Sequence, residues 1–278
     1  MKKLAGFAGD VSSVSPSLPG NQELWFKIGY HIALDETGAA VELLKKLLAS
    51  DPYNAAAHLN LGVCLRELDE LDTALFYLGC AAELEADNAE AAFQYGTSLA
   101  INGEHKKAQK WLLKAVELVP DSECFLFNLA MNCLQMGKKE RAMLVFAEVL
   151  RLNPENLTAL YNTGLYNRLN RISDLGLAHF TKIINLNPSF YKAYQQLMRV
   201  ALMTNSYHEA VSAVQAGLQV NPDKADLILD KLALDSILNH SSEPFNHSAL
   251  EQLCPDAQTL LAERIFELKQ TIGDFNLN

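Results

Sequence analysis

A repeat of 34 residues constrains the fold of this chain more than any other feature of its sequence. Five prolines and one alanine recur at that spacing. A fixed period of this length predicts a stack of similar supersecondary units, each of which buries its apolar face against its neighbours. The recurring positions are Pro52, Ala86, Pro120, Pro154, Pro188 and Pro222.

Small residues between the prolines indicate two helices in each unit. Gly in a helix interior costs about 1 kcal/mol relative to Ala, so we expect Gly96 and Ala108 to mark the place where two helices approach closely. Met198 departs from the pattern, because it replaces the small residue of the sixth unit. The first-helix series is Gly29, Gly62, Gly96, Ala130 and Gly164, and the second-helix series is Ala40, Ala74, Ala108, Ala142, Gly176 and Ala210.

In these positions the sequence resembles the tetratricopeptide repeat (TPR), in six consecutive units over residues 22–222. The resemblance implies an all-α fold: a right-handed TPR solenoid of antiparallel helix pairs, six repeats plus C-terminal capping helices. We expect a flexible N-terminal arm at residues 1–20 and the six TPR units at residues 21–222. A seventh helix, a loop and a C-terminal capping helix are expected at residues 223–278.

The charge of the chain disfavours two classes of partner. A formal net charge of -10 and a pI near 5.2 argue against binding to nucleic acid or to an anionic membrane surface, which both require a basic face. No run of about 18 apolar residues occurs, so no membrane insertion is predicted. The absence of a recognisable signal segment and the odd number of five cysteines favour a cytoplasmic, reducing location.

The resemblance implies that one side of each first helix lines a concave groove, and a row of carboxamides falls on that side. A carboxamide both donates and accepts hydrogen bonds, so such a row could pair with the backbone of an extended peptide. In the alternative interpretation, these residues serve only helix packing and solubility. The row is Asn60, Gln94, Asn128, Asn162 and Gln196.

Large apolar residues accompany the carboxamides on the same side. Because a solvated face does not normally carry so much apolar surface, we predict a groove for an apolar or amphipathic segment of a partner protein. In the alternative interpretation, neighbouring helices or the N-terminal arm cover these side chains. The residues are Phe93, Phe127 and Tyr161, with Met131 and Leu165 one turn further on.

Charged residues at the two ends of this predicted groove suggest an orientation for the ligand. Arg168, Lys192 and Arg199 form a basic end, whereas acidic residues crowd the turn after residue 66. An acidic part of a peptide or its C-terminal carboxylate would then lie at the basic end. Ordinary solvated charge is the alternative.

No arrangement of residues typical of catalysis is visible. The sequence contains no Gly-rich phosphate loop, no His-Glu-x-x-His and no Cys-x-x-Cys pair. His240, His247 and Cys254 do not match a usual zinc spacing. We therefore predict no cofactor, no metal site and no enzymatic activity. His58 is expected to be a packed, hydrogen-bonded core residue.

These features together predict a non-enzymatic protein-protein interaction module, a cytoplasmic chaperone or adaptor that binds a peptide segment of a partner in the concave groove. The segment Leu59 to Phe93 resembles the repeats of type III secretion chaperones that guard translocator proteins. The carboxylate-clamp set of other family members is matched only at Asn60, because Phe26, Tyr30, Glu90 and Gln94 stand in the places of the other clamp residues. An oligomeric assembly scaffold and a regulatory subunit of an enzyme are the alternatives, the former with self-association through Leu24–Leu34.

Overall fold

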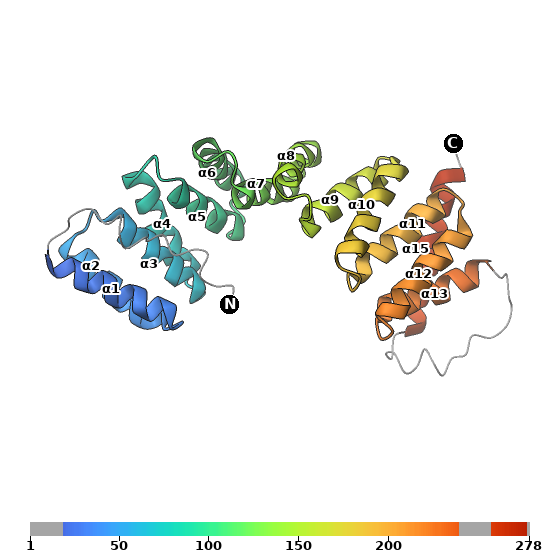
Figure 1. Cartoon of the computed structure of the whole chain (residues 1–278), viewed down its shortest axis with the longest axis horizontal. Helices are drawn as coiled ribbons and strands as arrows, with labels where there is room; N and C mark the ends of the chain where they lie inside the picture. Colours follow the sequence, from blue (N-terminus) through green and yellow to red (C-terminus); the bar gives the residue numbers. More distant parts are fainter. Residues whose placement is uncertain (1–18, 239–256, 277–278) are drawn as a thin grey trace. The chain divides into compact units, whose positions relative to one another are not determined.

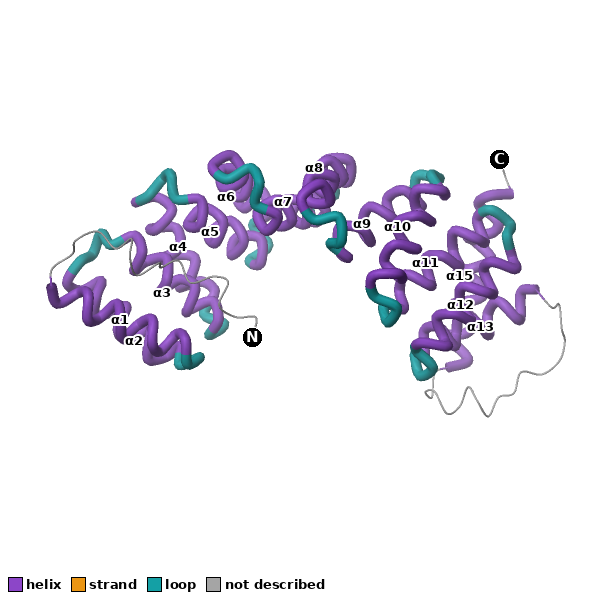
Figure 2. The backbone as a smooth tube through the Cα atoms, viewed as in Figure 1, coloured by secondary structure: helices purple, strands orange, loops and turns teal. Residues whose placement is uncertain are grey.

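The computed structural model describes residues 19–238 and 257–276, and within them every regular element is a helix (Figures 1 and 2). The expected arm is thus described only from Pro19. His240, His247 and Cys254 lie in residues 239–256, outside the described residues. The helices are α1 (Pro19–Ala33), α2 (Thr37–Ser50), α3 (Ala55–Glu67), α4 (Leu71–Leu84), α5 (Ala89–Ile101), α6 (His105–Leu118), α7 (Glu123–Gln135), α8 (Lys139–Leu152), α9 (Leu157–Leu169), α10 (Ser173–Leu186), α11 (Tyr191–Met203), α12 (Tyr207–Val220), α13 (Ala225–Leu238) and α15 (Ala257–Asn276).

The chain divides into two compact units, residues Met1–Leu152 and Asn153–Asn278. The first unit contains α1 to α8, and the second contains α9 to α15. Within each unit, consecutive helices up to α13 pack on one another, and from α3 to α12 the closest packing lies inside the helix pairs. The predicted all-α array of helix pairs is therefore confirmed.

The helix pairs share a turn geometry, and four of them also share the way in which the first helix begins. An Asn or Ser side chain caps four of the first helices by accepting a hydrogen bond from a backbone N–H in the first turn, which satisfies one of the unpaired donors there. A residue with positive φ, between 56° and 79°, then lies in the turn inside every pair. The caps are Asn54, Asn88, Ser122 and Asn156; the turn residues are Asp35, Asp69, Gly103, Gly137, Arg171 and Asn205.

The small residue in the first helix is required by the packing inside the pair. A Cβ atom added to Gly96 would lie 3.0 Å from both the Cγ atom and the backbone nitrogen of Leu112 on α6. The expected close approach at Gly96 is thus confirmed, and Leu112, one turn after Ala108, makes the contact. In the sixth pair Met198 is fully buried and shares a core cluster with Val214, which occupies the place of Leu112 with a smaller side chain.

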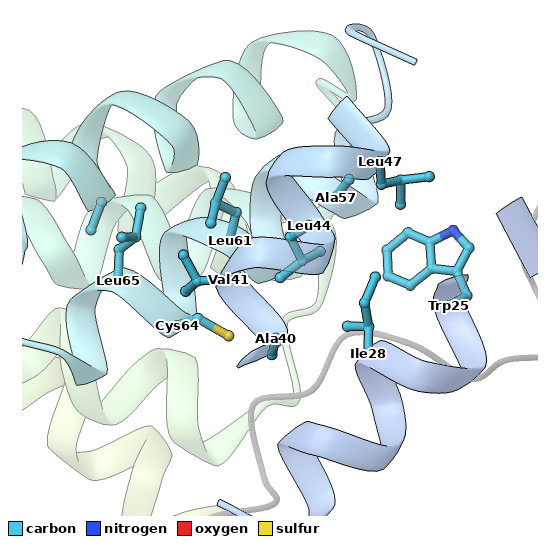
Figure 3. Packing of buried hydrophobic residues seen from close by; sticks show 11 residues of the cluster. Trp25, Ile28, Ala40, Val41, Leu44, Leu47, Ala57, Leu61, Cys64 and Leu65 are labelled. Atoms are coloured by element: carbon cyan, nitrogen blue, oxygen red, sulfur yellow. The ribbon is translucent and has the colours of Figure 1, made fainter. Parts of the chain in front are cut away.

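The core of the first unit lies between the paired helices. Trp25 and Ile28 of α1 are turned toward Leu44 and Leu47 of α2, and all four side chains are buried (Figure 3). Burying a large apolar side chain contributes about 1.5–3 kcal/mol. His58 is buried next to this core, where its Nε2 atom lies 2.8 Å from the Pro52 carbonyl oxygen. The predicted core role of His58 is confirmed.

The last described helix does not pack as a simple end cap. In the second unit α15 contacts α13 and also α11, the first helix of the preceding pair (Figure 1). It therefore lies across two first helices instead of covering only the last one. None of the helices in residues 19–238 and 257–276 combines the length and the apolar character needed to cross a membrane.

Candidate functional site

The sequence places the candidate residues on one side of the first helix of each pair, and we call this side the first-helix face. In the first unit this face belongs to α1, α3, α5 and α7, and in the second unit to α9, α11 and α13. Because the candidate residues are divided between the two units, each face is described by itself.

Two of the three carboxamides in the first unit are buried and serve the protein itself. Asn60 is 2% exposed, and its Nδ2 atom donates to the Ala56 carbonyl oxygen at 2.8 Å. Gln94 is 5% exposed. Asn128 is only half-buried and donates to the Cys124 carbonyl oxygen at 2.9 Å, while its Oδ1 atom has no hydrogen-bond partner among the described residues. The row is therefore not uniformly open to a ligand.

Arg66 of α3 explains why Gln94 is buried. Its guanidinium crosses to α5 and donates to Gln94 Oε1 at 2.8 Å and to Ser98 Oγ at 3.0 Å. Gln94 in turn donates from Nε2 to Glu90 Oε1 at 2.6 Å. Burial lowers the pKa of Arg66, while Glu67 and Glu90 oppose that shift. These hydrogen bonds link the neighbouring first helices α3 and α5.

The apolar side chains on the first-helix face of the first unit differ in exposure from helix to helix. Phe93 is buried and stacks on Phe125 at a centroid distance of 4.6 Å. Phe127 and Met131 of α7 are half-buried. Phe26 and Tyr30 of α1 are 71% and 57% exposed, which is unusual for aromatic side chains. Open apolar surface therefore remains on α1 and α7, whereas Phe93 belongs to the core.

An acidic edge borders this face where α5 and α7 begin. The half-buried Glu90 and Glu123 flank the exposed Cys124. Burial, Glu90 and Glu123 all raise the pKa of the Cys124 thiol. Since two carboxylates disfavour a third negative charge, this edge suits a neutral or basic group of a ligand.

In the second unit, the carboxamides and Tyr161 are partly buried and locally bonded. Asn162 donates to the Thr158 carbonyl oxygen at 2.8 Å, and Gln196 donates to the Tyr161 hydroxyl at 3.4 Å. The Tyr161 ring packs against Phe180 and Phe190, and burial raises the pKa of its hydroxyl. Leu165 is half-buried on the same helix. These side chains fill the space between α9 and α11.

The three predicted basic residues lie in different environments. Lys192 is exposed, Arg168 is half-buried, and burial together with the neighbouring Arg199 lowers the pKa of Arg168. Arg199 forms an ion pair with Glu267 of α15, its Nη2 atom 3.3 Å from Glu267 Oε2. One of the three predicted cations is therefore already paired within the chain.

A buried polar cluster at α15 was not predicted. Asp230 of α13 is fully buried, and its two carboxylate oxygens accept from Gln195 at 2.6 Å and from Arg264 at 2.8 Å. Burial raises the pKa of Asp230, and Arg264 and Gln195 oppose that shift. The available sequence signal was a lone aspartate within the apolar stretch Leu227–Leu234, because a buried carboxylate requires a partner.

The described residues show neither a cluster of metal ligands nor an activated thiol. Within residues 19–238 and 257–276, no three His, Cys, Asp or Glu side chains lie close enough to hold a metal ion. Burial raises the pKa of every described thiol, which disfavours the nucleophilic thiolate. A surface depression of about 460 Å³ lies at the turn between α5 and α6, lined by residues 103–107 and Met136, outside the predicted site.

Comparison with known proteins supports the helix-pair repeat. Residues 67–149 match the family model of the anaphase-promoting complex, cyclosome, subunit 3, and residues 43–76 match a tetratricopeptide repeat model. None of the curated protein sequences matches the chain. The narrower resemblance to type III secretion chaperones stays a prediction.

Solved structures similar to this chain share its architecture at low sequence identity. YrrB, described as a TPR protein with an unusual peptide-binding site, is 18% identical with a TM-score of 0.60, over 68% of this chain and 97% of YrrB. PilF of Pseudomonas aeruginosa is 21% identical with a TM-score of 0.62, over 78% and 96%. MamA is 20% identical with a TM-score of 0.55, over 58% and 94%. At such identities the likeness concerns the fold alone.

Proposed function

We propose that this chain, a tetratricopeptide-repeat protein, is a non-enzymatic interaction module that binds a peptide segment of a partner protein on the first-helix face of its first unit. The observation that carries the proposal is the open apolar surface there. Phe26 and Tyr30 of α1 are more than half exposed, and Phe127 and Met131 of α7 are half-buried. Exposed aromatic side chains of this kind are typical of binding surfaces.

The chemistry of the ligand follows from what surrounds this surface. Apolar anchors of the partner would contact the aromatic rings and Met131, whose flexible thioether adapts to different shapes. A basic or neutral group would face Glu90 and Glu123. Asn128 is the carboxamide best placed to pair with a peptide, since Asn60 and Gln94 are buried and occupied. The proposed ligand is therefore an amphipathic segment of neutral or positive charge.

Two further observations support a peptide ligand. The similar protein YrrB is described as carrying a peptide-binding site. The net charge of -10 disfavours polyanionic partners. In the cell, we propose a cytoplasmic adaptor or chaperone that holds such a segment. In the second unit, Arg168 and Lys192 stay candidates for an acidic group of a ligand.

A matched pair of phenylalanines tests the binding surface. Phe26 on α1 and Phe76 on α4 are similarly exposed, at 71% and 65%, but Phe76 belongs to a second helix. Peptides are selected from a displayed random library on the wild-type protein, and their Kd values are measured by calorimetry. We expect Phe26→Ala and Met131→Ala to weaken binding by roughly fivefold or more, as for interface hot spots.

Phe76→Ala serves as the control and should change the Kd by less than about twofold, the range of a neutral contact. Equal effects at Phe26 and Phe76, or a library that yields no binding peptide, would contradict the proposal.

An assembly scaffold is the second candidate, favoured by the exposure of Phe26 and Tyr30 near one end of the described chain. It predicts that the wild-type protein associates with itself through α1. Sedimentation at increasing protein concentration decides between the two roles: a monomer at all concentrations excludes the scaffold, and dissociation caused by Phe26→Ala supports it.

A further inference from the structure

The helix α15 contacts the first-helix face of the second unit in the way a bound helical ligand would. Its apolar side chains at residues 261, 265, 268 and 272 form one stripe along the helix, as expected for an amphipathic helix in a groove. Leu261 and Leu268 are buried in one cluster with Met198 of α11 and Leu229 of α13. The opposite side of α15 is exposed, including Phe266 at 64%.

Ion pairs fix the position and direction of α15 on this face. Arg264 reaches Asp230 Oδ1 at 2.8 Å and Asp226 Oδ1 at 3.3 Å. Glu267 of α15 pairs with Arg199 of α11 at 3.3 Å. The two charges on α15 thus face opposite charges on α13 and α11. This is the complementarity that sets the register and specificity of a docked helix.

The face carries charged groups beside its apolar cluster. Asp230 is fully buried, and its partner Arg264 comes from α15. A buried carboxylate that loses its partner is costly, but without α15 this face would be open to water, which would solvate the carboxylate. Asp226, Asp230, Gln195 and Arg199 therefore suit a surface that is filled in one state and hydrated in another.

Residues 239–256 lie between α13 and α15 in the sequence. α15 is thus an intramolecular occupant of this face. An external helix replaces it only if the external helix makes better contacts.

We propose that the face formed by α11 and α13 is a binding site for an amphipathic partner helix with an arginine between two leucines, and that α15 occupies this site until such a helix displaces it. The spacing of Leu261, Arg264 and Leu268 defines the ligand pattern Leu-x-x-Arg-x-x-x-Leu. This site is separate from the surface proposed on the first unit, so the failure of either proposal leaves the other standing.

The test uses the full chain and a labelled synthetic peptide of residues 257–276, with binding measured by fluorescence anisotropy. Arg264→Gln in the full chain weakens its own α15, so the wild-type peptide should bind this variant roughly tenfold or more tightly than the wild-type chain, the range for loss of a charge-assisted pair. Lys269→Gln is the matched control, because it removes one positive charge from an exposed position of the same helix. It should leave the affinity within about twofold of wild type, as a surface substitution does.

A second peptide tests the stated partner pattern. It carries only Leu261, Arg264, Ile265, Glu267, Leu268 and Ile272 on an otherwise Ala- and Gln-based helix, and it should bind the Arg264→Gln chain within roughly tenfold of the native peptide. No binding by this peptide, or equal binding of the native peptide to the Arg264→Gln and Lys269→Gln chains, would overturn the proposal.

Hydrogen exchange distinguishes an occupant from a structural element. In Arg264→Gln, amide protection should fall in α15 while α12 keeps the protection that it has in wild type. If α11, α12 and α13 lose protection together with α15, then α15 is a required part of the second unit and the proposal is wrong.

Discussion

The packing at Gly62 allows a stability prediction whose magnitude follows from the geometry. A Cβ atom added to Gly62 would lie 2.5 Å from Leu78 Cγ, 2.8 Å from Leu78 Cδ2 and 3.1 Å from the Ala74 carbonyl oxygen. Leu78 is fully buried, and its Cγ atom moves only if χ1 rotates or the helices separate. Gly62→Ala therefore forces either a new rotamer of the buried Leu78 or a separation of the two packed helices.

Two opposing terms set the size of the effect. Replacing Gly by Ala in a helix interior gains up to about 1 kcal/mol. Inserting a methyl group into a filled core costs about 1–3 kcal/mol. The net change in the free energy of unfolding is then a loss of about 0–2 kcal/mol. Gly38→Ala on α2 is the control, because no atom lies within 4 Å of its added Cβ, and it should be neutral or stabilising by up to about 1 kcal/mol.

Native-state hydrogen exchange measures the difference where it arises. Repeat proteins can open locally, so a single melting curve would average over several helix pairs. The opening free energy of amides in α3 and α4 should be about 1–3 kcal/mol lower in Gly62→Ala than in Gly38→Ala. If Gly62→Ala is as stable as Gly38→Ala, close helix contact is not the reason for glycine at this position.

Two further predictions concern the turn at Gly103 and the buried Cys64. Gly103 has φ +79°, and no atom lies within 4 Å of an added Cβ. Gly103→Ala should therefore lower the free energy of unfolding by about 1–2 kcal/mol through backbone strain alone. Urea denaturation that shows no such loss would refute this. Burial raises the pKa of the Cys64 thiol from 9.0 to about 12. The stability that the buried neutral thiol contributes is therefore complete below pH 9 and is lost as the pH rises toward 12. The free energy of unfolding is measured by urea denaturation between pH 8.5 and 10.5, a range chosen to span the onset of that loss. It should fall less steeply with pH in Cys64→Ala than in wild type, by at most about 1.4 kcal/mol per pH unit. Identical pH dependence in the two proteins would count against burial of this thiol as the cause.

The repeating architecture could be predicted from the sequence because it depends on local and periodic properties. Prolines end the second helices, and glycine or alanine marks the places where helices touch. These signals recur every 34 residues, so each copy supports the interpretation of the others. The turn residues at Gly103 and Gly137 follow the same period, although only the structure shows that four turns place non-glycine residues at positive φ.

The accessibility of the candidate site could not be predicted in the same way. Helix periodicity places Gln94 and Asn128 on the same side of their helices, and neighbouring side chains then decide which of them meets solvent. Gln94 is buried because Arg66 of the preceding pair reaches it, whereas Asn128 stays half-buried. Phe93 likewise becomes part of the core by stacking on Phe125.

By itself, the sequence therefore determined the helix pairs, their order and the residues that hold each pair together, since these depend on a pattern repeated along the chain. The tertiary structure decided which carboxamides and aromatic rings are exposed, and it showed that α15 lies on α11 and α13. That contact joins residues outside the repeat, such as Arg264 and Asp230, and their complementary charges become visible only when folding brings them together.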